Sequence, residues 1–176
     1  AESLFLSHFP ESPEDAENAR QYLAYEEIFE LILAAKLNKQ ENQRLQAQPL
    51  PFNAEFIQSL VKSLPFQLTG AQRRATWEIL QELERKTPMN RLLQGDVGSG
   101  KTIVAALASA QTALNGCQTA LLAPTAILAT QHFESLVKLF QGLQKANPGI
   151  MMPRIALLTG ATTSKRQLKE LIRTGQ

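Results

Sequence analysis

The sequence predicts an α/β fold in which a parallel sheet is sandwiched by helices, preceded by a long N-terminal helix. From Met89 onward, short apolar runs alternate with helical patterns, an order typical of βαβ units and a parallel sheet covered on both faces. A glycine-rich turn separates the first apolar run from the helix that follows it. Between Pro13 and Pro49 the chain is nearly free of helix breakers, which favours one long helix.

The size and composition of the chain limit its class. A length of 176 residues with 44% hydrophobic side chains is enough for about one ordinary core. Cys117 is the single cysteine, so no intrachain disulfide is possible, and we expect an inert thiol in a reducing cytoplasm. The sequence has neither a signal-peptide pattern nor about 20 consecutive apolar residues, so we expect no membrane partner.

Charge is distributed unevenly along the chain. Residues 1–96 hold 10 Lys/Arg and 14 Asp/Glu, a balance of −4, whereas residues 97–176 hold 8 and 2, a balance of +6. The basic second half fits a phosphate-rich ligand or backbone. An unevenly charged, solvated surface is the alternative that charge alone leaves open.

One long predicted helix dominates residues 1–48. Ser12, Pro13 and Asp15 supply an N-cap, a proline at the first helical position and an acidic side chain three residues after the serine. Apolar residues spaced i, i+3, i+4 and i+7 form one stripe that we expect to pack on something: Tyr25, Ile28, Phe29 and Ile32. Residues 38–48 are polar almost all round, so the helix there either projects into solvent or frays.

Residues 49–88 form a second region, which prolines punctuate. We expect a short helix at 54–64 and a further helix through Trp77 and Leu83, capped by Thr69. Residues 89–176 then alternate between strand and helix patterns. The expected strands are 91–94, 119–123 and 155–158, and the expected helices are 102–114 and 126–143.

The glycine-rich turn matches the phosphate-binding pattern G-x-x-x-x-G-K-[ST] in full, between an expected strand and an expected helix. Glycines let the backbone wrap around phosphate oxygens with its N–H groups pointing inward. We expect Lys101 to reach the β and γ phosphates and the Thr102 hydroxyl to hold Mg²⁺, which makes these two the candidate catalytic residues. The residues expected to bind the nucleotide are Gly95, Asp96, Val97, Gly98, Ser99, Gly100, Lys101 and Thr102.

Few acidic residues follow this turn. Hydrolysis by such a site also needs a carboxylate at the end of another strand to hold the metal shell. No aspartate follows Asp96, and the later acids are Glu134, within an expected helix, and Glu170, near the end. We therefore expect the chain to bind a nucleotide better than it hydrolyses one.

Four short runs extend the pattern beyond the turn. They are 64–72 (LPFQLTGAQ), 91–102 (RLLQGDVGSGKT), 123–132 (APTAILATQH) and 157–160 (LLTG). In this order and spacing they resemble the RecG family of superfamily-two DNA translocases. The resemblance implies a RecA-like P-loop NTPase fold with ATP and Mg²⁺ as cofactors, and it makes Gln72 the candidate for contact with adenine.

The same resemblance implies contacts with DNA. Thr125 is expected to offer a hydroxyl and a helix N-terminus to a DNA phosphate, a contact that positions the protein without reading sequence. Further backbone contacts are implied for Thr159, Gly160, Lys165 and Arg166. His132 lies on an apolar helix face, so we interpret it as a packed histidine.

The N-terminal region also resembles that family, through 7–10 (SHFP), Arg20 and 23–27 (LAYEE). The resemblance divides the chain into a linker helix region (1–48), a helical segment with the adenine-recognition motif (49–88) and an incomplete N-terminal part of the ATP-binding domain (89–176). It implies a fragment of a bacterial ATP-dependent DNA helicase that remodels stalled replication forks and recombination junctions, without the Walker B segment and second lobe.

Three alternatives stay open from the sequence. Within the class, a transcription-repair coupling factor or a primosomal helicase carries a similar phosphate loop. A small-molecule kinase of the P-loop type would need an arginine-bearing lid and an acceptor pocket, and neither is recognisable. A non-catalytic interaction module built on the long helix, with a vestigial loop, is the third.

Overall fold

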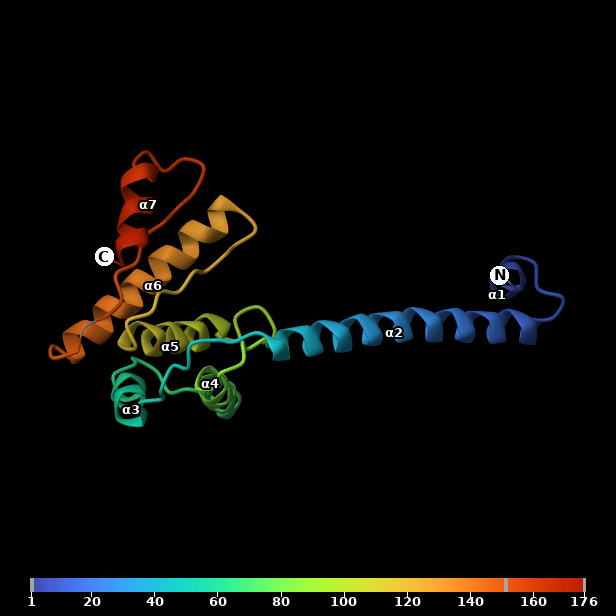
Figure 1. Cartoon of the computed structure of the whole chain (residues 1–176), viewed down its shortest axis with the longest axis horizontal. Helices are drawn as coiled ribbons and strands as arrows, with labels where there is room; N and C mark the ends of the chain where they lie inside the picture. Colours follow the sequence, from blue (N-terminus) through green and yellow to red (C-terminus); the bar gives the residue numbers. More distant parts are fainter. Residues whose placement is uncertain (1, 151, 176) are drawn as a thin grey trace. The chain divides into compact units, whose positions relative to one another are not determined.

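The computed structural model describes residues 2–150 and 152–175, and the chain separates into two units, Ala1–Ala47 and Gln48–Gln176. The described residues form helices joined by irregular segments (Figure 1). The helices are α1 (Glu2–His8), α2 (Pro13–Arg44), α3 (Ala54–Lys62), α4 (Gly70–Leu83), α5 (Lys101–Leu114), α6 (Ala126–Ala146) and α7 (Lys165–Thr174). Among them, α1 and α7 were not predicted, and α6 extends beyond its expected end.

The first unit consists of α1 packed on α2. The Ser12 hydroxyl accepts a 3.1 Å hydrogen bond from the backbone N–H of Asp15 and donates one of 2.6 Å to the Asp15 carboxylate. Pro13 is the first helical residue, so the predicted helix start is confirmed. The helix continues to Arg44. Residues 38–44 are therefore helical despite their polar side chains.

The apolar stripe predicted on α2 is open in the described part of the chain. Its four members, Tyr25, Ile28, Phe29 and Ile32, are each more than half exposed. Tyr25 and Phe29 stack on one another with ring centroids 6.2 Å apart, so the stripe is covered only by its own side chains. The expectation that it packs on another element is therefore unconfirmed.

The second unit has one core, built around α5. Figure 1 shows α5 in the middle of this unit, with α3 and α4 to one side and α6 to the other. Val104 and Leu107 of α5 are almost completely buried. They belong to one apolar cluster with Leu60 of α3, Leu80 of α4 and Leu143 of α6. Burial of such side chains is the main favourable term in folding, so α5 is fixed on several sides.

The predicted strands are not present in the described residues. Segments 91–94, 119–123 and 155–158 run without helix or strand, and no described backbone hydrogen bond joins one to another. Leu93 and Ile155 pack against the core, whereas Leu92 and Leu122 are almost fully exposed. A helix satisfies its backbone within itself, but a parallel strand depends entirely on neighbouring strands, and here the helices alone supply the regular structure.

A buried amide ties the start of the second unit to α5. Gln111 of α5 is fully buried; its side-chain amide donates to the carbonyl of Pro51, and its side-chain oxygen accepts from the N–H of Asn53 at 3.4 Å. The Asn115 amide donates to the same Pro51 carbonyl at 3.3 Å. A buried polar side chain of this kind is tolerated because it is hydrogen-bonded.

The same entry segment is tied to α4. The Leu50 N–H donates to the carbonyl of Leu83 at 2.9 Å, and the Phe52 N–H donates to the Glu84 carboxylate at the same distance. The Phe52 ring meets Trp77 edge-on, with centroids 5.2 Å apart. Consequently α4 and α5, which also contact each other, together hold the segment 50–53 in place.

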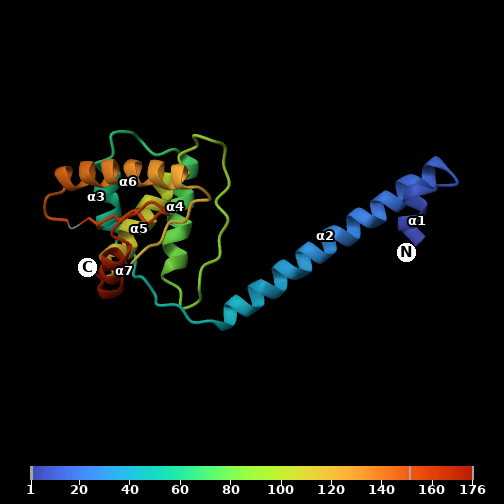
Figure 2. The same ribbon diagram turned by 90° about the horizontal axis from the view of Figure 1, so that it is seen from above.

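The chain between α4 and α5 doubles back. Figure 2 shows the irregular segment that follows α4 running back beside that helix before α5 begins. This path brings the glycine-rich turn, which immediately precedes Lys101, to the N-terminal end of α4. The two helices therefore both begin at this turn.

Candidate nucleotide-binding site

The turn before α5 depends on left-handed backbone at two glycines. Gly98 has φ 83° and Gly100, the N-cap of α5, has φ 81°. Residues with a Cβ adopt the left-handed backbone region at a cost in free energy, whereas glycine adopts it freely. The N–H of Ser99 donates to the carbonyl of Asp96 at 3.1 Å and closes the turn. The predicted phosphate loop thus has the tight, glycine-dependent path that its pattern indicates.

At two of the glycines, an added Cβ would displace a neighbouring side chain. A Cβ at Gly95 would lie 2.7 Å from the hydroxyl oxygen of Ser99. A Cβ at Gly100 would collide with the side-chain nitrogen of Gln72. The loop is therefore closed on itself at one end and pressed against α4 at the other.

Lys101 folds back over the loop. Its ammonium donates to the backbone carbonyls of Gly95 at 2.7 Å and Asp96 at 2.9 Å. These two bonds hold the positive charge inside the curve of the loop while the side chain stays exposed. The first residues of α5 add N–H groups that lack partners within the helix, and the helix dipole favours an anion there. The arrangement suits a phosphate group.

Thr102 is the second residue of α5 and is half-buried. Its hydroxyl is a hard oxygen ligand of the type that Mg²⁺ accepts, with phosphate oxygens and water completing the shell. No group of three or more His, Cys, Asp or Glu side chains able to hold a metal occurs within the described ranges. The Thr102 hydroxyl would fit one position in the shell of a Mg²⁺ ion bound to phosphate.

Gln72 joins the start of α4 to the loop. Its side-chain oxygen accepts from the N–H of Thr69 at 2.9 Å, and the Thr69 hydroxyl accepts from the N–H of Gln72 at 3.2 Å. This reciprocal capping box confirms Thr69 as the predicted cap. The Gln72 amide also donates to the carbonyl of Ser99 at 2.8 Å. One N–H and one lone pair of the carboxamide are left for a ligand.

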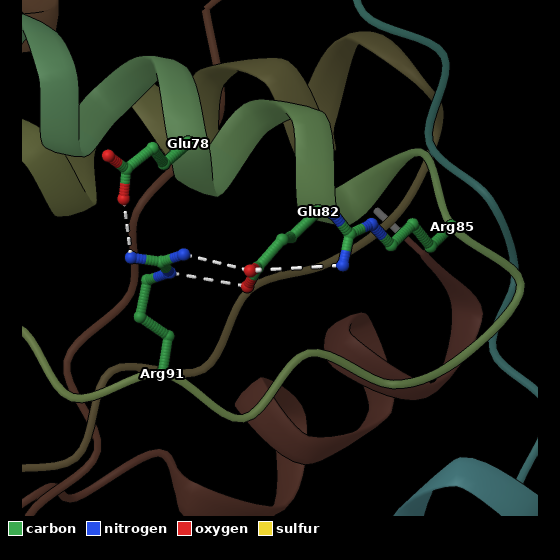
Figure 3. Close-up of polar contacts among 4 residues, drawn as sticks. All are labelled: Glu78, Glu82, Arg85 and Arg91. Carbon is green, nitrogen blue, oxygen red and sulfur yellow. Dashed lines mark hydrogen bonds and ion pairs between the residues drawn. The ribbon is translucent and has the colours of Figure 1, made fainter.

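Arg91, four residues before the loop, is held by two acids of α4 (Figure 3). Its guanidinium donates to Glu82 through Nη2 at 2.8 Å and Nε at 3.2 Å, and to Glu78 through Nη1 at 2.7 Å. The hydrogen bond to Glu82 raises the pKa of Arg91 above its usual value. This cluster was not predicted, because Arg91 lies 9 and 13 residues from the two acids.

The residues predicted to contact DNA lie in two places. Thr125 is the exposed N-cap of α6, and its hydroxyl accepts from the N–H of Leu128 at 3.2 Å. Thr159 belongs to a turn before α7, where its N–H donates to the Thr162 hydroxyl at 2.9 Å. The Lys165 ammonium donates to the carbonyl of Gly160 at 2.6 Å. The structure thus brings Thr159, Gly160 and Lys165 together. Arg166, the residue after Lys165, is exposed.

Other singled-out side chains have ordinary surroundings. His132 is half-buried within α6. Cys117 is half-buried, and its thiol contacts the carbonyl of Asn115 at 3.7 Å. Glu134 is exposed in α6, and Glu170 pairs with Arg173 at 2.6 Å, a hydrogen bond that lowers the pKa of Glu170. In the described part of the chain, no helix has both the length and the apolar character that crossing a membrane requires.

Comparison with known proteins places this geometry in a family. Residues 69–176 match the model of the DEAD/DEAH box helicases, a range that contains Gln72, the phosphate loop and every residue predicted to contact DNA. Relatives described as "ATP-dependent DNA helicase RecG" are similar along nearly the whole chain. The one from Thermotoga maritima is 44% identical over 99% of this chain and 22% of its own length. The one from Bacillus subtilis is 43% identical over 97% of this chain and 24% of its own length.

A solved structure, of RecG bound to a three-way DNA junction, is similar at 42% identity with a TM-score of 0.76, and the match covers 99% of this chain and 23% of that chain. The chain therefore spans between a fifth and a quarter of the length of these relatives. The resemblance to the RecG family is confirmed, and the matches imply a RecA-like fold. The chain belongs to the DEAD/DEAH box helicase family.

Proposed function

We propose that this chain is the nucleotide-binding part of an ATP-dependent DNA helicase of the RecG type, which remodels stalled replication forks and recombination junctions. The observation that carries the proposal is the closed phosphate loop, with Lys101 folded into it and Gln72 of α4 bonded to its backbone. The names of the relatives support ATP as the nucleotide, and the junction bound to the RecG neighbour supports DNA as the partner.

Phosphate binding follows from the loop residues. When a phosphate enters the loop, its oxygens would replace the Gly95 and Asp96 carbonyls as acceptors of the hydrogen bonds that the Lys101 ammonium donates. The backbone N–H groups of the loop and of the first turn of α5 complete the cradle. Thr102 would hold Mg²⁺, which supplies positive charge against the phosphates when bound.

Adenine recognition falls to Gln72 in this proposal. A carboxamide can donate to and accept from one edge of adenine, and Gln72 keeps one donor and one acceptor for that use. Because the Gln72 amide also bonds to Ser99, the side chain that would bind the base is in direct contact with the loop that would bind the phosphates. A guanine edge presents the opposite donor and acceptor at its corresponding positions, so the site favours ATP.

DNA would run past the α6 N-terminus and the turn before α7. Thr125, Thr159, Gly160, Lys165 and Arg166 supply a helix N-terminus, hydroxyls, backbone and positive charge, all suited to phosphates. Such contacts give affinity without sequence preference. We place residues 1–48 as the linker region, 49–88 as the adenine-recognition segment and 89–176 as the start of the ATP-binding domain of a cytoplasmic bacterial enzyme.

Turnover by this chain alone is proposed to be slow. No aspartate follows Asp96, and Glu170 is engaged by Arg173. A steady-state phosphate-release assay with and without duplex DNA tests this, and robust turnover by pure protein would contradict it.

The exposed stripe on α2 favours a second candidate, a non-catalytic interaction module. A measurement of ATP binding distinguishes these two candidate functions. A fluorescent ATP analogue titrated into the chain should bind and should lose most of its affinity in Lys101→Ala, while Lys138→Ala, an exposed lysine of α6, should bind normally. Absence of binding by the folded, unmodified chain would favour the module.

A further inference from the structure

The segment that leads into the phosphate loop is weakly held by packing. Leu92 is 86% exposed, and Val97 within the loop is fully exposed. Leu93 is the residue of this stretch that packs against the core. A loop that must present several N–H groups to one phosphate needs a fixed backbone, because ordering it on binding would cost affinity. Something other than apolar burial has to fix it.

Arg91 supplies a strong polar attachment at the front of this segment. Its guanidinium engages both oxygens of Glu82 through two nitrogens, and a third nitrogen engages Glu78 (Figure 3). Its side chain is 31% exposed and that of Glu82 is 21% exposed, so the pair is partly shielded from solvent. Isolated surface pairs contribute little, but two-point arginine geometry and a network of charges are the recognised exceptions.

The same helix holds the far side of the loop. Gln72, in the first turn of α4, bonds to the carbonyl of Ser99, while Glu78 and Glu82, further along the helix, bond to Arg91. The chain runs back along α4 between these attachments (Figure 2). The loop from Gly95 to Ser99 is therefore suspended between two fixed points on one helix, and that helix is packed on α5.

We propose that Arg91, through Glu82 and Glu78, is a positioning residue that sets the phosphate loop for nucleotide binding. This inference rests on the proposed nucleotide site. Arg91 does not itself touch the nucleotide. It fixes the backbone that does, in the way that a preorganised site lowers the cost of binding.

Charge reversal and its rescue test the pair. Arg91→Glu and Glu82→Arg should each weaken binding of a fluorescent ATP analogue at least about tenfold, since each removes both charge-assisted hydrogen bonds between these two side chains. The double variant Arg91→Glu with Glu82→Arg should recover most of that loss. Arg85→Glu is the matched control, since Arg85 approaches the same Glu82 carboxylate at 4.0 Å but lies on the opposite side of it from Arg91. Its affinity should be unchanged.

The melting temperature without nucleotide, measured for each variant, separates positioning from general stability. Arg91→Lys keeps the charge but not the two-point geometry, so we expect weaker ATP binding with a melting temperature close to that of the unmodified chain. Equal ATP affinity in Arg91→Lys and the unmodified chain would overturn the inference, as would a double variant no better than the single ones. If Lys101→Ala binds ATP as well as the unmodified chain does, the nucleotide site itself fails, which is a different result.

Discussion

The side-chain amide of Gln72 donates a 2.8 Å hydrogen bond to the backbone carbonyl of Ser99, across 27 residues of sequence. The bond connects the first turn of α4 to the phosphate loop. Because the same carboxamide accepts from the N–H of Thr69, a change at Gln72 alters both the helix start and the loop. The proposed nucleotide site and the start of α4 are therefore linked through one side chain.

Gly98 and Gly100 share left-handed backbone but differ in their neighbours, so alanine at each position separates the cost of backbone strain from the effect of a steric contact. Gly98→Ala should cost about 1 kcal/mol of stability, since a left-handed residue with a Cβ carries that penalty. It has open space around it. Gly100→Ala carries the same penalty and also displaces Gln72, so it should weaken ATP binding much more than Gly98→Ala does. Urea unfolding and ATP titration of both variants measure the two effects.

Gly142→Ala is the control for these glycine changes. Gly142 lies in α6 without left-handed backbone, and nothing lies within 4 Å of the point that an added Cβ would occupy. Alanine there should stabilise the helix by up to about 1 kcal/mol and leave ATP affinity unchanged. Equal ATP affinity in Gly98→Ala and Gly100→Ala would show that the Gln72 contact does not contribute to nucleotide binding.

Features that depend on neighbouring residues were predictable, and features that depend on distant ones were not. Ser12, Thr69 and the phosphate loop follow local rules of capping and turns, and their helix starts and turn lie where expected. Arg91 meets acids 9 and 13 residues away, and no local pattern fixes that pairing. The three expected strands stay unconfirmed for a related reason, since a strand needs a partner and the apolar runs alone do not choose one.

The helix α7 was missed although its signal is local in the sequence. Its apolar residues recur at the helical spacing, Leu168, Leu171 and Ile172, but polar and charged residues surround them and the segment was interpreted only through its positive charge. A 3.6-residue period is a better guide than charge in such a segment.

Gln111 should be important for stability although it lies far in sequence from the residues that it bonds. Gln111→Leu removes the amide that bonds to Pro51 and the oxygen that accepts from Asn53. Loss of these two hydrogen bonds should cost about 1–3 kcal/mol, although Asn115 still donates to the Pro51 carbonyl. Gln141→Leu, the same change at an exposed position of α6, should stay within about 0.5 kcal/mol. Equal unfolding free energies for the two variants, from urea titration, would contradict this role.

DNA binding should depend on salt and on the basic residues at the start of α7. Affinity for a short duplex should fall linearly on a log–log plot against salt, and Lys165→Ala and Arg166→Ala should each reduce the slope by about one. Lys62→Ala, on α3, should leave the slope unchanged. Fluorescence anisotropy over a salt series measures this. A slope that is the same in all variants would exclude these residues from the DNA contact.

Gln72 and the phosphate loop are proposed to form one site for an adenine nucleotide, and this is the central claim. The direct measurement is the affinity for ATP and for GTP, by calorimetric titration, of the unmodified chain and of Gln72→Ala. We predict that the unmodified chain prefers ATP and that Gln72→Ala loses most of this preference, with a larger loss for ATP than for GTP. An equal loss for both nucleotides, or no preference in the unmodified chain, would contradict it.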